Sequence, residues 1–580
     1  MKMTDLRLSL LIETLISIPF IVAYLLFNKQ IIPQLFESLP MDYIGVIGSF
    51  FGWIVPLGVL FSLCTQWFYY GSVENLFRKG TFTMIVVVPM FITWGDFEFT
   101  FWLATVHWFS SLVSIYDLRQ ELQQNKRIQS IKAESFFSAF HLNPAQIVII
   151  TFLLAIIVGT TLLMLPIATK KDVALIDHLF MITSATCVTG LATVDLASSY
   201  TVFGQMVLLS CVQIGGLGIM TLSSSLTLFL GKNLEIRDQL LMQDILDLNS
   251  IEELYSMIID IIRTTFIIEM FGAIILTIIF FRDGIPFSDA LYSGIFHSIS
   301  AFCNAGFSLF PNNLENYKTN VGLNLTISLL IILGGIGFFV IKELRNVYFF
   351  RKQKLEHLSL HTKVMLSTTI FLISAGTISI FIGEFMTSLG QYNLGEKFLI
   401  SFFQSVTTRT AGFNTINIGL LNAHTLLIMC LLMFIGAGPV STAGGIKSST
   451  ALILWQSIKS TLSGKNRVEI FNREIHPSIV LKAMALTLIS FGLVMFISIL
   501  MVRLEEDKPF LSVVFEVVSA FGTVGLSTGI TPFLSDPGKL LIVLLMYIGR
   551  IGPLTLVLGI VRKKRENERV SYPQGRVLIG

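Results

Sequence analysis

A fourfold internal repeat constrains this chain more than any other feature. A phenylalanine precedes a Gly-Leu or Gly-Phe pair by ten residues at four places: Phe180 with Gly190-Leu191, Phe296 with Gly306-Phe307, Phe402 with Gly412-Phe413 and Phe515 with Gly525-Leu526. Successive glycines are 116, 106 and 113 residues apart. Such regular spacing predicts four copies of one structural unit.

The composition places these units in a membrane. The chain is 53% hydrophobic and 13% charged, against about 25% charged in an average soluble domain. Apolar runs such as Ile147 to Ile167 and Ile479 to Val502 are long enough to cross a bilayer. We therefore predict an all-α polytopic membrane protein. The net charge of +3 gives no indication of a nucleic-acid partner.

Each repeat has the plan helix, short segment ending at the glycine, helix. The first helices are expected at Gln146–Ala168, Thr264–Phe281, Val364–Met386 and Ile479–Val502, and the second at Phe203–Leu230, Val321–Ile341, His424–Trp455 and Gly538–Val561. The segments between them are too short to cross, at about 15 residues of 1.5 Å each. We expect four re-entrant loops that meet with pseudo-fourfold symmetry around one pore, because non-helical backbone at membrane depth needs protein or a water-filled cavity around it.

The expected domains follow the repeats. They are an amino-terminal extension of two to four helices (1–118), a cytoplasmic linker (119–142), pore repeats (143–245, 246–355, 356–470 and 471–562) and a tail (563–580). Lysine and arginine gather in the connections between repeats and in the tail, as in Arg562 to Arg565. This distribution predicts that both termini are cytoplasmic and that the glycine loops open to the outside.

The glycine loops carry the pattern of a carbonyl-lined ion filter. Backbone carbonyls can replace the hydration shell of a cation, and glycine reaches the positive φ that such backbones need. The predicted filter comprises Val188, Thr189, Gly190, Asn304, Ala305, Gly306, Thr410, Ala411, Gly412, Thr523, Val524 and Gly525. The eight expected K⁺-binding carbonyls belong to Thr189, Gly190, Ala305, Gly306, Ala411, Gly412, Val524 and Gly525. The alternative is that these are ordinary helix-packing residues.

A second glycine-rich signal recurs inside each second helix. Close helix packing accounts for Gly215 to Gly218 and Gly334 to Gly337, whereas the run from Gly436 to Ser449 is expected to break its helix beneath the loops. We predict a movable gate made of Gly436, Gly438, Ser441, Thr442, Gly444, Gly445, Lys447 and Arg550. Arg550 lies near the middle of a span, where an arginine costs at least about 2.5 kcal/mol, so we expect it to face a cavity or a partner. Facing the pore, it would form an electrostatic barrier. A purely structural pairing with carbonyls or a carboxylate is the alternative.

Three other polar residues are interpreted as structural. Arg409 is a charge in one loop of four, so we expect a tie behind the filter, to a carboxylate, rather than a place in the ion path. His297 and Glu516 occupy equivalent repeat positions, and both are expected to support the loops.

These motifs together resemble the superfamily of potassium transporters that includes the bacterial TrkH and KtrB proteins and the plant HKT proteins. The resemblance spans Asn143 to Arg562 and is carried by Thr186 to Leu191, Asn304 to Phe307, Thr408 to Thr415, Thr523 to Leu526, Gly438 to Lys447 and Gly549 to Pro553. It implies a pseudo-fourfold pore, a homodimer and a cytoplasmic ring of TrkA/KtrA-like nucleotide-binding regulatory subunits. Glycine in all four loops resembles the potassium-selective members. The amino-terminal extension departs from both bacterial types.

We therefore predict potassium uptake across the plasma membrane, with membrane lipid as the surroundings, potassium as the transported ion and no organic cofactor. A proton- or sodium-coupled transporter of a monovalent cation, including one that conducts sodium, is the alternative. A scaffold without transport is a further one. An enzyme is not expected, because the chain lacks metalloprotease, phosphate-loop and dinucleotide motifs.

Overall fold

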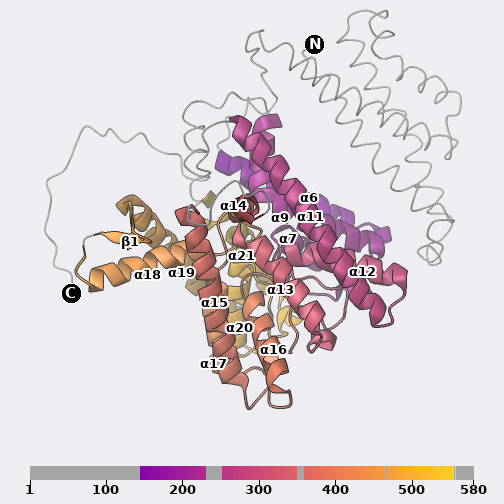
Figure 1. Cartoon of the computed structure of the whole chain (residues 1–580). Helices are drawn as coiled ribbons and strands as arrows, with labels where there is room; N and C mark the ends of the chain where they lie inside the picture. Colours follow the sequence, from indigo (N-terminus) through magenta and orange to yellow (C-terminus); the bar gives the residue numbers. More distant parts are fainter. Residues whose placement is uncertain (1–143, 230–250, 349–357, 466, 554, 557–580) are drawn as a thin grey trace, which may run out of the picture. The chain divides into compact units, whose positions relative to one another are not determined.

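The computed structural model describes residues 144–229, 251–348, 358–465, 467–553 and 555–556 (Figure 1). The chain divides into two compact units, 1–139 and 140–580, and the described residues belong to the second. The predicted amino-terminal extension, linker and tail therefore lie outside the described residues.

The described chain is helical apart from one short hairpin, and the predicted fold class is confirmed. Repeat 1 contains α6 (Pro144–Leu163), α7 (Leu175–Thr186), α8 (Leu196–Ser199) and α9 (Val202–Phe229). Repeat 2 contains α11 (Ile251–Arg282), α12 (Phe287–Phe302), α13 (Val321–Ile336) and α14 (Phe338–Tyr348). Repeat 3 contains α15 (Leu360–Glu384), α16 (Leu394–Thr407), α17 (Ala423–Phe434) and α18 (Ser448–Leu462). Repeat 4 contains α19 (Pro477–Leu504), α20 (Phe510–Gly522) and α21 (Asp536–Ile551).

The hairpin joins repeats 3 and 4. Strands β1 (Val468–Ile470) and β2 (Arg473–Ile475) pair antiparallel, with Val468 opposite Ile475 and Ile470 opposite Arg473. The hairpin packs against α18 (Figure 1).

Three helices are long and apolar enough to cross a membrane: Asp260–Arg282 within α11, Leu360–Glu384 and Pro477–Leu504. The bent pair α13 and α14 is a fourth candidate span. Large apolar side chains lie exposed along these helices, and Leu488 of α19 is 71% exposed. Such exposure fits a surface that faces lipid, where apolar side chains need no cover.

The repeats close into a ring. The second helix of each repeat packs against the short helix of the next, and the contacts follow the order α9 with α12, α13 with α16, α17 with α20, and α21 with α7. The last contact joins repeat 4 back to repeat 1. Three of the repeat phenylalanines, Phe180, Phe296 and Phe515, are fully buried, whereas Phe402 is half-buried.

Caps specified by the sequence define several helix starts. The side chains of Asn320 and Ser535 accept hydrogen bonds from Leu323 N (3.1 Å) and Gly538 N (3.2 Å), at the starts of α13 and α21. Asn393 and Glu396 form a capping box at the start of α16. These bonds satisfy amides that a helix start leaves without partners.

Three predicted boundaries were wrong. The helix expected at Val321–Ile341 bends by 105° between α13 and α14, with φ 102° at Gly337. The helix expected to reach Val561 ends at Ile551, before Gly552 with φ 89°. The first helix of repeat 2 begins at Ile251, well before the expected Thr264. The first two errors share a cause, since a glycine of positive φ interrupts a continuous apolar run.

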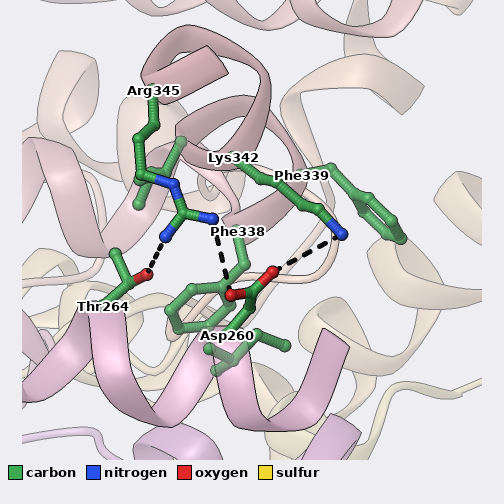
Figure 2. Close-up of a pocket in the computed structure, with 8 residues that line it drawn as sticks. Asp260, Thr264, Phe338, Phe339, Lys342 and Arg345 are labelled. Atoms are coloured by element: carbon green, nitrogen blue, oxygen red, sulfur yellow. Dashed lines mark hydrogen bonds and ion pairs between the residues drawn. The ribbon is translucent and has the colours of Figure 1, made fainter. Parts of the chain in front are cut away.

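The helix α14 is fixed to both neighbouring long helices. Asp260 of α11 forms ion pairs with Lys342 (3.7 Å) and Arg345 (3.5 Å), and Arg345 also donates to Thr264 Oγ1 at 3.2 Å (Figure 2). Glu343 accepts hydrogen bonds from Ser359 at the start of α15. Because these bonds act after the bend at Gly337, they hold the redirected chain in place.

Candidate functional site

The four glycine loops meet in a closed ring. A Cβ added to any of the four glycines would press on the carbonyl oxygen of the residue that precedes the glycine of the next loop. The pairs are Gly190 with Ala305, Gly306 with Ala411, Gly412 with Val524, and Gly525 with Thr189. The structure therefore brings all four predicted loops together in chain order, and each close approach requires a residue without a side chain.

Each loop contains two left-handed residues. The glycines have φ of 94°, 68°, 76° and 89° in chain order, as the sequence predicted. Two residues earlier, φ is 56° at Val188, 60° at Asn304, 70° at Thr410 and 50° at Thr523. This second position was not predicted, because Val188, Thr410 and Thr523 are β-branched residues, which strongly favour negative φ. Each such residue costs on the order of 1–3 kcal/mol, a strain typical of functional sites.

Serines of the short helices hold three loops in place, and sequence reasoning missed them. Ser184 Oγ accepts from Gly190 N at 3.0 Å, and Ser519 Oγ accepts from Gly525 N at 3.1 Å. Ser300 Oγ donates to the carbonyl of Phe307 at 2.8 Å. All three lie six residues before the repeat glycine, so alignment of the repeats on that glycine could have found them. Val406 occupies this position in repeat 3.

His297 and Glu516 form equivalent contacts, as their shared repeat position suggested. His297 Nε2 lies 3.0 Å from Ser308 Oγ, and Glu516 accepts a hydrogen bond from Ser527 Oγ. Each serine lies two residues after its glycine. Both side chains are fully buried within the protein and connect a short helix to the loop that follows it. This geometry supports the structural interpretation.

The glycine-rich run inside each second helix begins with a glycine, and in three repeats this glycine lies against the end of a short helix. A Cβ on Gly215, Gly334 or Gly549 would overlap the carbonyl oxygen of Thr186, Phe302 or Phe521, respectively. Backbone therefore packs on backbone, and the packing account of Gly215 and Gly334 holds at this position. It does not account for Gly337, where the helix of repeat 2 bends.

The predicted break in repeat 3 is present, because α17 ends at Phe434 and α18 begins at Ser448. We call residues 435–447 the intramembrane loop. The amides of Gly438 and Thr442 donate to the carbonyls of Gly335 (2.8 Å) and Gly334 (3.3 Å). In return, Phe338 N donates to the carbonyl of Val440 at 3.1 Å. The intramembrane loop is thus bonded to the bend of repeat 2.

The intramembrane loop also contains internal hydrogen bonds, and it contacts the part of the ring that repeat 4 contributes. Gly436 N donates to Ile446 O at 2.8 Å, Lys447 Nζ donates to Ala443 O at 2.7 Å, and Ser441 Oγ donates to Gly438 O at 2.6 Å. Gly445 has φ 64°. A Cβ on Gly444 would overlap the side chain of Thr523, one of the left-handed residues of the ring. The ring and the loop are therefore in direct contact.

Arg550 joins the intramembrane loop to repeat 1. The residue is 3% exposed, and its guanidinium donates to the carbonyls of Thr442 and Gly215. Both recorded partners are carbonyls, which is the pairing that the structural alternative describes. Thr442 Oγ1 in turn donates at 3.3 Å to Phe302 O at the end of α12, so Arg550 is bonded to a loop residue that contacts the short helix of repeat 2.

Arg409 is buried behind the ring, as expected, at 5% exposure. Its Nη2 donates to the carbonyl of Gly436 at 3.4 Å, at the start of the intramembrane loop. The recorded partner is a carbonyl and not the carboxylate that we expected. The tie therefore connects the third loop of the ring to the broken helix of its own repeat.

These features define a class of protein. It is a polytopic α-helical membrane protein in which four repeats surround one ring of backbone carbonyls, and a broken helix that accepts hydrogen bonds from buried arginines lies against that ring. The chain belongs to the TrkH family, described as cation transport proteins, whose model matches residues 127–570.

Three similar proteins match about three quarters of the chain. It is 42% identical over 439 residues to Ktr system potassium uptake protein B of Bacillus subtilis, covering 75% of this chain and 97% of the relative. A protein of the same name from Vibrio alginolyticus is 36% identical, with 75% and 94% covered. The potassium/sodium uptake protein NtpJ of Enterococcus hirae is 35% identical, with 76% and 98% covered.

The fold is similar to that of a solved structure, the potassium transporter TrkH from Vibrio parahaemolyticus. The TM-score is 0.58 at 16% sequence identity, and the match covers 90% of this chain and 97% of the other. At this identity the likeness establishes the fold alone.

Proposed function

We propose that this protein takes up potassium across the plasma membrane through a channel-like pore whose filter is the ring of glycine loops. The observation that carries the proposal is the closed ring of carbonyls, in which each loop presents an oxygen to the glycine of its neighbour. Carbonyl dipoles can replace water around a monovalent cation and do so without a fixed charge that would hold the ion too tightly.

The short helices reinforce this function. The helices α7, α12, α16 and α20 end three to five residues before the ring glycines, so their carboxyl ends face it. The carboxyl end of a helix carries a partial negative charge, which favours a cation. Eight carbonyls, two in each loop, are the proposed ligands, from Thr189 and Gly190 through to Val524 and Gly525.

The gate of this pore is the intramembrane loop with Arg550. The loop is anchored by backbone hydrogen bonds and by two arginines, Arg409 and Arg550, and it has few bulky side chains to pack. Loss of the Arg550 bonds would free the loop from repeat 1. We propose that Arg550 also opposes cations electrostatically while the gate is closed.

The relatives extend the proposal to partners and location. Those from Bacillus subtilis and Vibrio alginolyticus are named as potassium uptake proteins of a Ktr system. We infer for this chain a homodimer in the cell membrane, with both termini in the cytoplasm and a cytoplasmic TrkA/KtrA-like nucleotide-binding subunit ring on the inner face.

Flux through purified protein in liposomes tests the function. Rubidium-86 influx should occur without any other ion gradient, and potassium should compete with rubidium much better than sodium does. Four single variants serve as the comparison, in which serine replaces Gly190, Gly306, Gly412 or Gly525. Retained flux in all four variants would remove the ring from the transport path.

A second candidate is sodium transport or sodium-coupled uptake, favoured by the name of the Enterococcus relative, a potassium/sodium uptake protein. The same liposomes distinguish it. Rubidium influx that requires an inward sodium or proton gradient would establish coupling. Equal competition by sodium and potassium would establish a non-selective or sodium-conducting pore.

A further inference from the structure

The connection between α12 and α13 contacts two neighbouring loops of the ring. Asn313 Nδ2 donates to the carbonyl of Gly306 at 3.3 Å. One residue later, Leu314 N donates to the carbonyl of Asn414, just after the ring glycine of repeat 3, at 3.1 Å. Asn414 Nδ2 in turn donates to Glu315 Oε1 at 3.1 Å. The connection is therefore fixed against the loops of repeats 2 and 3.

The bond from Asn313 makes the ring asymmetric. Among the eight proposed ligand carbonyls, all within the described loops, that of Gly306 is the one recorded as accepting a hydrogen bond. The residues seven positions after the other ring glycines are Ala197, Gly419 and Pro532, none of which has an amide side chain. The asymmetry is thus specific to repeat 2.

The protein holds Asn313 in a demanding conformation. Its φ is 54°, in the left-handed region, and its backbone amide donates to Phe310 O at 3.0 Å. Its Oδ1 is buried, and no donor is recorded for that atom. A left-handed backbone and an unsatisfied buried acceptor are both unfavourable. The fully buried Leu314 that follows explains how the segment is held there.

We propose that Asn313 determines the cation affinity and selectivity of the ring. Its side-chain amide donates a hydrogen bond to the Gly306 carbonyl, and this bond leaves repeat 2 with a weaker cation ligand than the other repeats. This inference rests on the proposed function. Selectivity among alkali cations depends on the number and field strength of the coordinating carbonyls, and a carbonyl already bound to an N–H offers less of both.

Two substitutions separate this role from support of the loop. Asn313→Asp keeps the size and the tolerance of left-handed φ but replaces the donor with an acceptor beside Gly306. Asn313→Ala removes the donor and leaves the carbonyl free. Both should raise the apparent affinity for potassium and rubidium, with the larger gain, at least about threefold, for the aspartate, which also adds a charge. The exposed neighbour Asn312, changed to alanine, is the control.

The readouts are the half-saturating rubidium concentration and the potassium-to-sodium competition ratio in liposomes. A purely structural role predicts lower yield or flux with both quantities unchanged. Unchanged or weaker affinity in both variants would overturn the proposal. Where a monodisperse variant lacks flux, the potassium concentration that half-saturates its thermal stabilisation replaces the flux measurement, because a ligand that binds the folded state raises its unfolding temperature.

Failure of this inference is distinguishable from failure of the proposed function. If the wild-type protein shows neither rubidium flux nor stabilisation by potassium, the proposed function fails. If the wild type transports selectively and both Asn313 variants match it, the inference on Asn313 alone fails.

Discussion

At the scale of single residues, the ring depends on what glycine lacks. Each of the four glycines has positive φ, and each lies where a Cβ would overlap a neighbouring carbonyl. These two requirements are independent, since one concerns the local backbone and the other the adjacent repeat. An alanine therefore violates both at once.

We expect Gly190→Ala and Gly525→Ala to reduce rubidium flux at least about tenfold, because the added Cβ displaces a ring carbonyl and raises the barrier to conduction. Flux per unit of reconstituted protein measures the effect. Gly492→Ala in α19 is the matched control, since a Cβ there meets nothing within 4 Å. Wild-type flux in both ring variants would contradict this account.

Arg550 is the second residue whose effect can be predicted. Arg550→Gln removes the positive charge of the proposed barrier. It also removes the two-armed guanidinium that links the carbonyls of Thr442 and Gly215, so we expect rubidium flux to rise at least about threefold. Arg550→Lys keeps the charge but loses the fork that reaches two carbonyls. A rise in rubidium flux in both variants would assign the effect to the lost hydrogen bonds. A rise in Arg550→Gln alone would assign it to the charge. Unaltered flux in both variants would rule out a barrier.

At the scale of elements, two breaks in apolar helices are bonded together. The bend between α13 and α14 supplies carbonyls and an amide to the intramembrane loop of repeat 3. The bend is itself fixed by the bonds of α14 to both neighbours, from Arg345 to Asp260 of α11 and from Glu343 to Ser359 at the start of α15. Movement of α14 would therefore change the anchor of the loop.

Deletion of residues Gly438 to Gly444 tests the loop directly. We expect rubidium flux to increase, because the deletion removes most of the proposed gate and retains the ring itself. Monodisperse elution of the variant checks that it folds. Gly438→Ala is a milder form, since its Cβ would lie 2.6 Å from the carbonyl oxygen of Ile336 and loosen the loop. Unchanged flux in both would count against a gate.

The sequence predicted the ring because spacing and residue type agree in all four repeats. It did not predict the left-handed Val188, Asn304, Thr410 and Thr523, which share no residue preference for that backbone. Nor could it separate Gly334 to Gly337 from Gly215 to Gly218, which have nearly the same letters. One run bends and the other continues as a helix. The difference lies in tertiary contacts, such as the ion pairs that fix α14.

At the scale of the whole molecule, contacts between repeats 4 and 1 complete the structure. α21 packs against α7, and Lys539 at the start of α21 forms an ion pair with Asp177 of α7 at 2.7 Å. Both side chains are largely buried, with 10% and 15% exposed. The pair connects residues far apart in the chain at the point where the ring closes.

We expect Asp177→Asn or Lys539→Met alone to lower the free energy of unfolding by about 3–5 kcal/mol, because each leaves one buried charge without its partner. The double variant should lose less than the sum of the two. Denaturation in detergent measures these differences. Glu469→Gln, which breaks the exposed pair with Lys465, is the control and should change stability by less than about 1 kcal/mol. Additive losses would show that the two charges do not interact.

The contact of α21 with α7 also has a consequence for biosynthesis. The first ring loop is completed by its neighbours, and its partner across the closure, Gly525, leaves the ribosome more than 300 residues after Gly190. Contacts between such distant segments form late in folding. A nascent chain that ends before repeat 4 therefore has three of the four loops, and the ring closes only after repeat 4 has been synthesised.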